Sequence, residues 1–526
     1  MAQSPLPHLL ALSTAYACIL SHNWDCHLLP VFIGSWAFAL ATHIFIWVSW
    51  IYPYHVSELR HVPTVPGFPL WGQYFDIISQ ECGVPQREWH QRYGPIVRYF
   101  FPFGSERLSV AEQSALSRIT GDRSNQYLKP WRARVWISRI FGNGLLMAEG
   151  DEHRHQRRIL LPAFSSQSIK ACAPIVWEKA LILTDRWHDL TQNAGCDPMT
   201  LEVSEWLSRA TLDAIGETCF GQDINSLRQP KSTIVASYKL LLFPTPLCRV
   251  FQGLRTFFPI SRYIPIQPNR DMDRAEEDIA NLASRMLRQK EFETREKGNS
   301  YRGRQDLISL MMSQDQSFRV MGGASVSFQD KRDQVMTFLG AGHDATAVTL
   351  AWSLHLLAKH STVQRKLRQE IKAHLPLLFG ERATCSMAAL AAADLDRLPY
   401  LNNVCREILR YIPAVPSISR ESQLDDVLAG YHVPAGTTVH ISPNTINHLP
   451  LYWGEKPSEF DPDRWDNLPD CWTPGAFMTF SRGLRACIGR RLLEMLMKVF
   501  LCALVEGVQD DATAQRRNHI DRVNYI

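Results

Sequence analysis

Apolar residues dominate one long stretch near the N-terminus. The chain carries no Asp, Glu, Lys or Arg from Cys26 to Ser57, and Leu28–Tyr52 is almost unbroken in its apolar character. A helix of this length spans about 37 Å, which is enough for a bilayer core of about 30 Å. Trp47 and Trp50 lie near its end, where interfacial aromatic residues are typical. The pattern predicts a membrane-spanning helix over about residues 28–52.

Two alternatives and one open question concern this helix. A buried core helix is the first alternative. A cleaved signal peptide is disfavoured, because no Lys or Arg precedes Arg60. Arg60 itself, just past the span, favours a cytosolic body. The shorter apolar run Leu9–Leu20 leaves open whether the chain crosses the membrane twice.

The body begins after a short proline-rich segment. Three prolines within residues 61–70 stiffen that segment, which we interpret as a hinge between an anchor, 1–60, and a body, 71–526. Most of the body reads as helices joined by loops. At Gly430–Ile441 a turn is followed by alternating β-branched residues, which predicts a strand. We therefore expect a mainly α fold with small β-sheets.

One predicted helix, Asp333–His360, is apolar on nearly every face, which is typical of a helix buried inside a large protein. Gly340, Gly342 and Asp344 interrupt this pattern. Each glycine costs about 1 kcal/mol in a helix interior relative to alanine, and a buried carboxylate costs more unless something uses it. We expect a break here that opens the helical hydrogen bonds to a ligand or water.

Composition limits the classes of function. The formal net charge is +4 over 526 residues, which gives no electrostatic support for a nucleic-acid partner. The 12 cysteines include no Cys-x-x-Cys pair, so neither a zinc ribbon nor a thioredoxin-like centre is indicated. We interpret most of the cysteines as reduced and structural, in a reducing compartment.

The stretch with the clearest chemistry is Phe480–Gly489, which reads Phe-Ser-Arg-Gly-Leu-Arg-Ala-Cys-Ile-Gly. Gly483 and Gly489 flank Cys487 and allow positive φ and the close approach of a flat, bulky group. Free amide N–H groups at such a turn, with the charge of Arg485, favour a thiolate. A thiolate held in a loop over a planar face is the geometry of an axial haem ligand. The alternative is a buried free cysteine in a tight turn.

The pattern of Phe480, Gly483, Arg485, Cys487 and Gly489 resembles the haem-binding loop of the cytochrome P450 monooxygenases. The resemblance implies the cytochrome P450 fold with an N-terminal transmembrane helix. It also implies haem b as cofactor, with the Cys487 thiolate as the axial ligand to iron. Matching motifs cover nearly the whole body, and the chain most resembles membrane-anchored fungal members that make secondary metabolites.

The resemblance implies further cofactor contacts. His153 and Arg157 stand where the family has a tryptophan and an arginine that hold a haem propionate, and one helical turn puts both on one face. Arg420 and Arg485 match other propionate-binding positions, a role that suits a guanidinium because it binds carboxylates in a bidentate manner. Ala341 is the remaining expected contact.

A structural triad is also implied. Glu407 and Arg410 are three residues apart on a predicted helix, a spacing common among surface pairs and uninformative alone. Arg464, in a later Phe-Asp-Pro-Asp-Arg-Trp motif, matches an arginine that joins such a pair behind the haem loop in the family. Buried charges need partners, so three charged groups sharing bonds would stabilise the loop that carries Cys487.

Asp344 and Thr346 are the catalytic candidates, because the family uses an acid and a following threonine to relay protons. The threonine usually follows the acid directly, whereas here Ala345 takes that place. One residue rotates a side chain by about 100° around a helix. Proton delivery would then depend on Asp344, ordered water or a substrate hydroxyl.

A second departure from the family lies at the C-terminus. From Glu506 on the chain is polar, whereas the family continues with apolar strands that close one side of the substrate pocket. Either the chain lacks that hairpin, or its tail reflects an alternative reading of the gene.

We therefore predict a haem-thiolate monooxygenase that inserts one oxygen atom from O2 into a small lipophilic substrate such as a terpenoid, polyketide or alkaloid. No GxGxxG or flavin module is present, so an NADPH-cytochrome P450 reductase is the expected electron donor. The expected location is the endoplasmic reticulum membrane, with the body in the cytosol. A basic face for the reductase is one interpretation, and ordinary charge for solubility the other, of Arg154, Arg158, Arg482, Arg490, Arg491 and Lys498.

Two alternatives remain open. Ala345 leaves room for a rearranging or dehydrating haem-thiolate enzyme that uses no external electrons. The polar C-terminus leaves room for a non-catalytic haem-binding pseudoenzyme.

Overall fold

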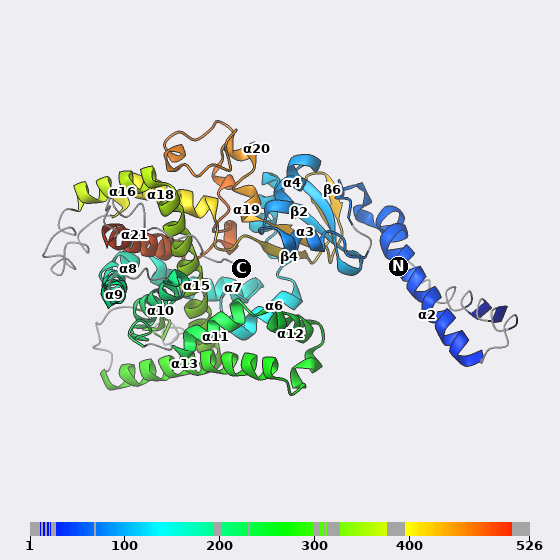
Figure 1. Ribbon diagram of the computed structural model, residues 1–526, viewed down its shortest axis with the longest axis horizontal. Coiled ribbons are helices and arrows are strands. Elements are labelled where there is room, and N and C mark those ends of the chain that lie inside the picture. The colour runs from blue at the N-terminus through cyan, green and yellow to red at the C-terminus, as the bar shows by residue number, and fades with distance from the viewer. Residues whose placement is uncertain are drawn as a thin grey trace. The chain divides into compact units, whose positions relative to one another are not determined.

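Two compact units make up the chain (Figure 1). The first contains residues 1–128 and 417–449, and the second contains residues 129–416 and 450–526. Their described parts are mainly helical with small β-sheets, as the sequence predicts. The computed structural model describes residues 28–67, 70–193, 201–229, 232–297, 306–309, 311–312, 327–375 and 395–507, with isolated positions between 11 and 22.

A five-stranded mixed sheet organises the first unit, in the order β1-β2-β7-β4-β3. β2 and β7 are parallel, and the other neighbours are antiparallel. β7 carries the alternating pattern predicted within Gly430–Ile441, and β5 and β6 form a separate hairpin. The strands are β1 (Ile96–Phe101), β2 (Ser105–Val110), β3 (Tyr127–Leu128), β4 (Ile418–Ser422), β5 (Asp426–Leu428), β6 (Tyr431–Val433) and β7 (Thr438–Ile441).

Short helices alternate with these strands along the chain of the first unit. Glycines begin and end α4, with positive φ at Gly83 and Gly94. The elements are η2 (Glu58–His61), α3 (Tyr74–Ser79), α4 (Val84–Tyr93), η3 (Pro102–Gly104), α5 (Gln113–Ser117), η4 (Arg118–Asp122) and α19 (Pro443–Ile446).

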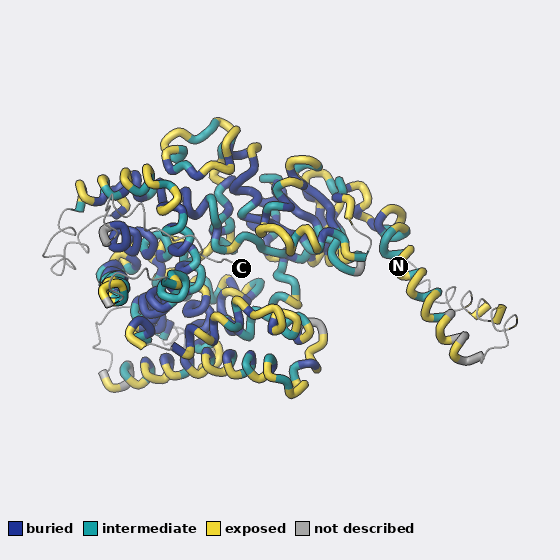
Figure 2. Tube along the Cα trace, in the orientation of Figure 1, coloured by how far each residue is buried: buried dark blue, intermediate teal, exposed yellow. Residues whose placement is uncertain are grey.

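The apolar N-terminal stretch is helical. α2 (Leu28–Ile46) continues into the π-helical η1 (Trp47–Val56), and most of its described side chains are exposed (Figure 2). Within the described residues, Trp36–Val56 is an unbroken helix long and apolar enough to cross a membrane. This candidate span lies a few residues beyond the expected 28–52, because the helix continues through Pro53. The run Leu9–Leu20 lies mostly outside the described residues.

The proline-rich segment that follows lies against the sheet. The backbone N–H of Val65 donates to the carbonyl of Arg98 at 2.9 Å, and the N–H of Arg98 donates to the carbonyl of Pro63 at 2.7 Å. Leu59 and Val62 are buried. Residues 57–65 therefore pack against the first unit and hydrogen-bond to β1 through Pro63 and Val65. Their role as a hinge stays a prediction.

The second unit is built around α15 (Phe328–Lys359), whose described neighbours include α6, α10, α11, α13, α16, α18 and α21. The helices of this unit are α6 (Trp131–Phe141), α7 (Gly150–Leu160), η5 (Leu161–Phe164), α8 (Ser166–Lys170), α9 (Ala173–Asn193), α10 (Val203–Phe220), α11 (Thr233–Leu242), α12 (Pro246–Phe257), η6 (Pro259–Tyr263), α13 (Gln267–Lys297), α15, α16 (Ser361–His374), η10 (Leu395–Arg397), α18 (Pro399–Tyr411), α20 (Pro450–Trp453), η11 (Pro462–Trp465), η12 (Pro474–Ala476), η13 (Gly483–Arg485) and α21 (Arg490–Gly507).

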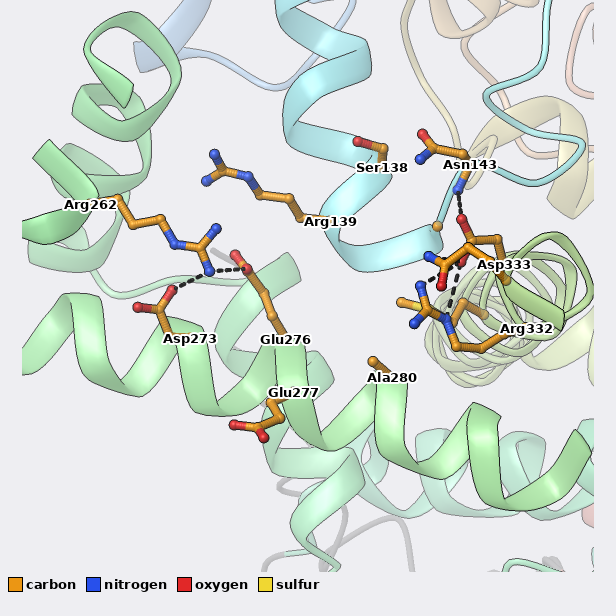
Figure 3. Close-up of a pocket in the computed structure, with 13 residues that line it drawn as sticks. Ser138, Arg139, Asn143, Arg262, Asp273, Glu276, Glu277, Ala280, Arg332 and Asp333 are labelled. Carbon is orange, nitrogen blue, oxygen red and sulfur yellow. Dashed lines mark hydrogen bonds and ion pairs between the residues drawn. The ribbon is translucent and has the colours of Figure 1, made fainter. Parts of the chain in front are cut away.

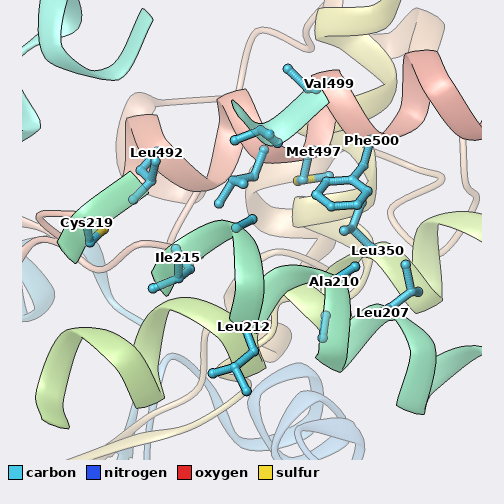
Figure 4. Close-up of a cluster of buried hydrophobic side chains, with 14 of the residues drawn as sticks. Leu207, Ala210, Leu212, Ile215, Cys219, Leu350, Leu492, Met497, Val499 and Phe500 are labelled. Atoms are coloured by element: carbon cyan, nitrogen blue, oxygen red, sulfur yellow. The ribbon is translucent and has the colours of Figure 1, made fainter. Parts of the chain in front are cut away.

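Aliphatic and aromatic side chains from α10, α15 and α21 meet in the core of this unit (Figure 4). Leu207, Leu350 and Phe500 are fully buried there. Burying one such side chain contributes about 1.5–3 kcal/mol relative to leaving it exposed. This packing fixes α15 and α21, the two helices that carry or adjoin the predicted chemistry.

The expected break in α15 is absent. The helix is α-helical from Phe328 to Lys359 without interruption. Its glycines serve close packing instead, since a Cβ at Gly340 would lie 2.8 Å from the ring of Phe141 and one at Gly342 would lie 3.1 Å from Ile215. α6 and α10 can therefore approach α15 closely at these positions.

Candidate functional site

The loop that carries Cys487 is closed by its own backbone. The N–H of Cys487 donates to the carbonyl of Phe480 at 2.9 Å, and the N–H of Ala486 donates to that of Gly483 at 3.1 Å. Gly483 has φ +63°, which glycine adopts without strain. Gly489 needs no such freedom in its backbone, and a Cβ there would lie 3.9 Å from the sulfur of Cys487.

The Cys487 sulfur faces a cavity. Cys487 is exposed to solvent, and it lines a cavity of about 830 Å³ together with Arg157, Phe164 and Arg490. The sulfur is open on the cavity side but closely surrounded by protein elsewhere, so burial raises the pKa of its thiol. The backbone N–H groups of Gly489 and Arg490 partly offset this, as does the Arg157 guanidinium. The predicted amide support for a thiolate is therefore present at this loop.

Helix α7 holds the same loop from a second side. Nη1 of Arg157 donates to the carbonyl of Ala486 at 2.8 Å. His153, one turn earlier, is buried, and burial lowers its pKa to about 4 with help from the charges of Arg485, Lys129 and Arg157. A neutral His153 and a cationic Arg157 thus share one face of α7 near the Cys487 loop.

Arg485 is anchored at the start of α7. Its guanidinium pairs with Glu149 and donates to the carbonyl of Ala148 at 2.7 Å. Lys129 pairs with Glu149 as well, at 3.2 Å. Although burial alone would raise it, the charges of Lys129 and Arg485 hold the pKa of Glu149 below its ordinary value. The guanidinium has five N–H donors, so these contacts leave donors for another carboxylate.

Asp344 and Thr346 lie in different surroundings on α15. Ala341 is exposed and Asp344 and Ala345 are partly exposed, on one open face of the helix. Burial raises the pKa of Asp344 to about 6. Thr346 is buried, and its hydroxyl donates to the carbonyl of Gly342 at 2.6 Å. An ionisable acid is therefore available on the open face, whereas the threonine hydroxyl is bound to its own helix.

The structure brings Glu407, Arg410 and Arg464 together in the second unit. Glu407 accepts two hydrogen bonds of 2.8 Å from Arg410 and one of 3.1 Å from Arg464. It also accepts from the indole of Trp465 at 3.1 Å and from the N–H of Asp461 at 2.9 Å. Glu407 and Arg410 are completely buried. All lone-pair directions of the carboxylate are thus engaged, which a buried charge requires.

Arg420 belongs to the first unit. It is buried in β4, opposite Val439 of β7. Its predicted contact with a propionate stays a prediction.

The predicted basic face needs one correction. Arg154, Arg158, Arg490 and Arg491 are exposed. Lys498, by contrast, is buried and pairs with Asp396 at 2.5 Å. The reason is that α21 is buried on every face from Leu496 to Val505, so a side chain at position 498 cannot reach the surface.

Sequence reasoning missed Glu149 and Trp465. Glu149 directly precedes the motif that begins at Gly150, and no periodicity or spacing links it to Arg485. Trp465 directly follows Arg464, so the Phe-Asp-Pro-Asp-Arg-Trp motif held a signal for it. Its indole completes the hydrogen bonding of Glu407.

The residues present fit a haem. The cavity at Cys487 lies within the usual size range of cofactor sites, about 300–1,000 Å³. Its lining combines the apolar Leu161, Pro162, Phe164 and Ile488 with charged side chains, which are Arg157, Arg158, Arg490, Arg491 and Glu494. An apolar ring with carboxylate substituents matches this lining, and the exposed sulfur of Cys487 supplies a soft metal ligand.

Comparison with known proteins agrees with this geometry. Residues 62–509 match the family model "Cytochrome P450". The cytochrome P450 monooxygenase sphH of Aspergillus fumigatus is 33% identical to the chain, over 86% of the chain and 83% of that protein. The cytochrome P450 monooxygenases ALT8 of Alternaria alternata and FUM15 of Gibberella moniliformis are 29% and 31% identical, over 90% and 92% of the chain and 88% and 89% of those proteins. The chain therefore belongs to the cytochrome P450 family, whose members are haem-thiolate monooxygenases with a cysteine ligand.

Proposed function

We propose that the protein is a membrane-anchored monooxygenase that oxidises a small lipophilic substrate in fungal secondary metabolism, with Cys487 as its haem ligand. The observation that carries the proposal is the exposed Cys487 sulfur, held by a closed backbone loop and facing a cavity of about 830 Å³. The fungal origin of its named relatives supports the biological setting. Bound haem with a thiolate ligand supplies O2 cleavage and oxygen insertion.

The protein's own residues would bind and orient this cofactor. Arg157 and Arg485, with Arg420, would pair with the propionates, and His153 would support the face of α7 that holds Arg157. Phe480, Gly483 and Gly489 would shape the loop, and Ala341 would leave room above the ring. The buried cluster of Glu407, Arg410 and Arg464 would keep the loop rigid from behind.

Asp344 would manage protons on the open face of α15. Its pKa of about 6 places its titration near neutral pH, where an acid can both take up and release a proton. Because the Thr346 hydroxyl donates to Gly342, Asp344 would act through water or a substrate hydroxyl, with Thr346 supporting the helix locally.

Electrons would come from an NADPH-cytochrome P450 reductase. Exposed Arg158, Arg490 and Arg491 surround the loop and offer positive charge to an acidic partner. The helix Trp36–Val56 would anchor the chain in the endoplasmic reticulum membrane, with the body in the cytosol. The C-terminal tail, residues 508–526, lies outside the described residues and does not enter this proposal.

The test is turnover with and without the electron supply. The full chain is expressed with a reductase in a host that makes candidate terpenoids, polyketides or alkaloids, and the products are compared with those of a host without the gene. Oxygenated products that require NADPH and reductase support the proposal. Products formed without NADPH would instead indicate a rearranging enzyme, which the names of the relatives do not favour. A haem-loaded chain that oxygenates nothing would indicate a pseudoenzyme.

A further inference from the structure

Two buried side chains in the second unit each keep one polar atom without a partner. Tyr238 of α11 and His343 of α15 have exposed fractions of 2% and 0%. Among the described residues, neither the hydroxyl of Tyr238 nor Nε2 of His343 makes a hydrogen bond. Buried polar groups in native proteins are nearly always hydrogen-bonded, either to protein or to ordered water. The pair therefore calls for a partner other than the side chains around it.

The two side chains lie next to each other and have complementary hydrogen-bonding needs. Their ring centroids are 4.4 Å apart. Nδ1 of His343 lies 2.9 Å from the carbonyl of Leu339 and donates to it, because a carbonyl can only accept. Burial lowers the pKa of His343 to about 4, so the ring is neutral near pH 7 and Nε2 is an acceptor. The hydroxyl of Tyr238 is a donor, so one donor and one acceptor are left unfilled in the same place.

Asp344 adjoins this pair. It follows His343 directly and lies one turn after Gly340, where a Cβ would approach the ring of Tyr238 to 3.3 Å. The ring of Tyr238 therefore packs against the part of α15 that carries Asp344. The charge of Asp344 adds to burial in raising the pKa of Tyr238, so the carboxylate lies within electrostatic range of the hydroxyl. Because Asp344 is also partly exposed, it connects the buried pair with the open face of the helix.

The first turns of α15 show how polar side chains on this helix are otherwise satisfied. Asp333 accepts hydrogen bonds from Arg332 at 2.8 Å and from the backbone N–H of Asn143 at 2.9 Å (Figure 3). The hydroxyl of Thr337 donates to the carbonyl of Phe141 at 2.6 Å. Protein groups complete these contacts. Less than two turns further along the helix, the buried tyrosine and histidine lack such partners.

The groups that neighbouring helices present to this part of α15 are uncharged. From α10, the hydroxyl of Thr211 donates to the carbonyl of His343 at 3.0 Å. From α6, the ring of Phe141 packs against Gly340. Burial raises the pKa of Asp344 to about 6, and no charge within the described part of the chain adds to that shift. The hydrogen bonds of Asp344 are therefore what can tune this carboxyl group further.

We propose that Tyr238 and His343 bind one buried water molecule, and that this water hydrogen-bonds to the carboxylate of Asp344. The count of donors and acceptors closes. The water accepts from the Tyr238 hydroxyl, donates one O–H to Nε2 of His343 and donates the other to the carboxylate. Three hydrogen bonds are typical of a buried water. Tyr238 and His343 are then positioning residues for Asp344, and the inference rests on the proposed function, in which Asp344 handles protons.

Such a water would orient Asp344 where Thr346 does not. The hydroxyl of Thr346 donates to the carbonyl of Gly342 and is engaged with its own helix. A hydrogen bond that is donated to a carboxylate favours the ionised form and lowers its pKa. Loss of the bound water should therefore raise the pKa of Asp344 above its value in the wild type.

The test measures the pKa of Asp344 in variants that each remove one partner of the water. Urea midpoints of the haem-loaded full chain in detergent are recorded from about pH 4 to about pH 9. Each variant is compared with the same variant carrying Asp344→Asn, so that the contributions of other titrating groups cancel. For Tyr238→Phe, which keeps the ring and removes the hydroxyl, we expect an upward shift on the order of 1 pH unit. An unchanged pKa of Asp344 would overturn the inference.

His343 variants and a control assign the effect. His343→Asn keeps an N–H that can donate to Leu339 but loses the Nε2 acceptor, so it should give a similar upward shift. His343→Gln, which carries an acceptor further along the side chain, should restore part of the wild-type value. Tyr400→Phe, at a buried tyrosine on α18, is the matched control and should leave the pKa of Asp344 unchanged. An equal shift in Tyr400→Phe would mean that loosened packing is the cause, and the inference would fail.

The double variant Tyr238→Phe/His343→Asn tests whether one water is shared. If both side chains act through the same water, its shift should match that of a single variant, whereas additive shifts would count against the inference. The unfolding measurement does not depend on turnover, so the two proposals fail separately. A wild-type chain without a haem-thiolate spectrum would sink the proposed function, whereas an intact spectrum with an unshifted pKa in Tyr238→Phe would sink only this inference.

Discussion

Nη1 of Arg157 donates a hydrogen bond of 2.8 Å to the backbone carbonyl of Ala486, the residue directly before Cys487. One side chain of α7 therefore restrains the backbone at the sulfur, across 329 residues of sequence. Burial lowers the pKa of Arg157, and the neighbouring Cys487 opposes that shift. A charged donor at this carbonyl keeps the loop in place whether or not a propionate shares the guanidinium.

Replacing this donor should loosen the loop. Arg157→Gln removes a charged hydrogen bond, which is worth about 1.5–3 kcal/mol. We expect a lower ratio of haem to protein after purification and a lower urea midpoint. Arg154→Gln, at an exposed position on the same helix that does not line the cavity, is the control and should retain wild-type values. Identical haem content in the two variants would contradict the role assigned to Arg157.

The buried cluster around Glu407 should contribute strongly to the unfolding free energy. Glu407→Ala leaves the buried Arg410 without its carboxylate partner. Such a loss typically lowers the unfolding free energy by about 3–5 kcal/mol. Urea unfolding measures the loss. Glu459→Ala removes an exposed carboxylate nearby that pairs with Lys456 and should change the unfolding free energy by only about 0.5 kcal/mol. A loss below about 1 kcal/mol for Glu407→Ala would show that the cluster is not buried as described.

Asp344 makes stability depend on pH. Burial raises its pKa to about 6 in the folded chain, against about 3.9 when unfolded. The folded state therefore binds more protons between these values, and its stability falls as the pH rises from about 4 to about 6. Asp344→Asn removes the penalty, so we expect a gain of up to about 3 kcal/mol at pH 8 and almost none at pH 4.

Urea midpoints of the wild type and Asp344→Asn at both pH values check this expectation. Asp189→Asn, at an exposed carboxylate on α9, is the control. Its urea midpoint should differ from that of the wild type by the same small amount at both pH values. An Asp344→Asn gain that is as large at pH 4 as at pH 8 would mean that the carboxylate is not the source of the effect.

A buried ion pair joins the anchor helix to the sheet of the first unit. Arg98 donates to Glu106 at 3.1 Å and to the carbonyl of Pro53 at 3.0 Å, and the Ser57 hydroxyl donates to Glu106 at 2.6 Å. Glu106→Ala leaves the buried Arg98 without a carboxylate partner. We expect trypsin to cleave after Arg60 several-fold faster in this variant. Glu58→Ala, at an exposed position, should leave the cleavage rate unchanged, and equal rates in both variants would show that the pair does not restrain this segment.

Sequence alone predicted the features that depend on strong periodicity or on local motifs. The uncharged apolar run predicted the N-terminal helix, and the all-round apolar pattern of Asp333–His360 predicted the buried α15. The alternation before Ile441 predicted β7. These signals are local, because one segment alone determines which faces are apolar.

Features that depend on distant partners could not be predicted in the same way. The glycines at 340 and 342 suggested a break, yet Phe141 and Ile215 pack against them and the helix stays regular. The sequence suggested that Lys498 belongs to a basic face, but its side chain is buried on α21 and pairs with Asp396. The pairing of Glu149 with Arg485 joins residues 336 apart, and only the fold brings them together.

The absorption spectrum of the reduced, carbon monoxide-bound protein tests the haem-thiolate claim most directly. The account predicts a red-shifted Soret band for the wild type and for Cys471→Ser, an exposed cysteine that serves as control, and loss of that band in Cys487→Ser. A colourless wild-type chain, or a Cys487→Ser variant that keeps the red-shifted band, would contradict it.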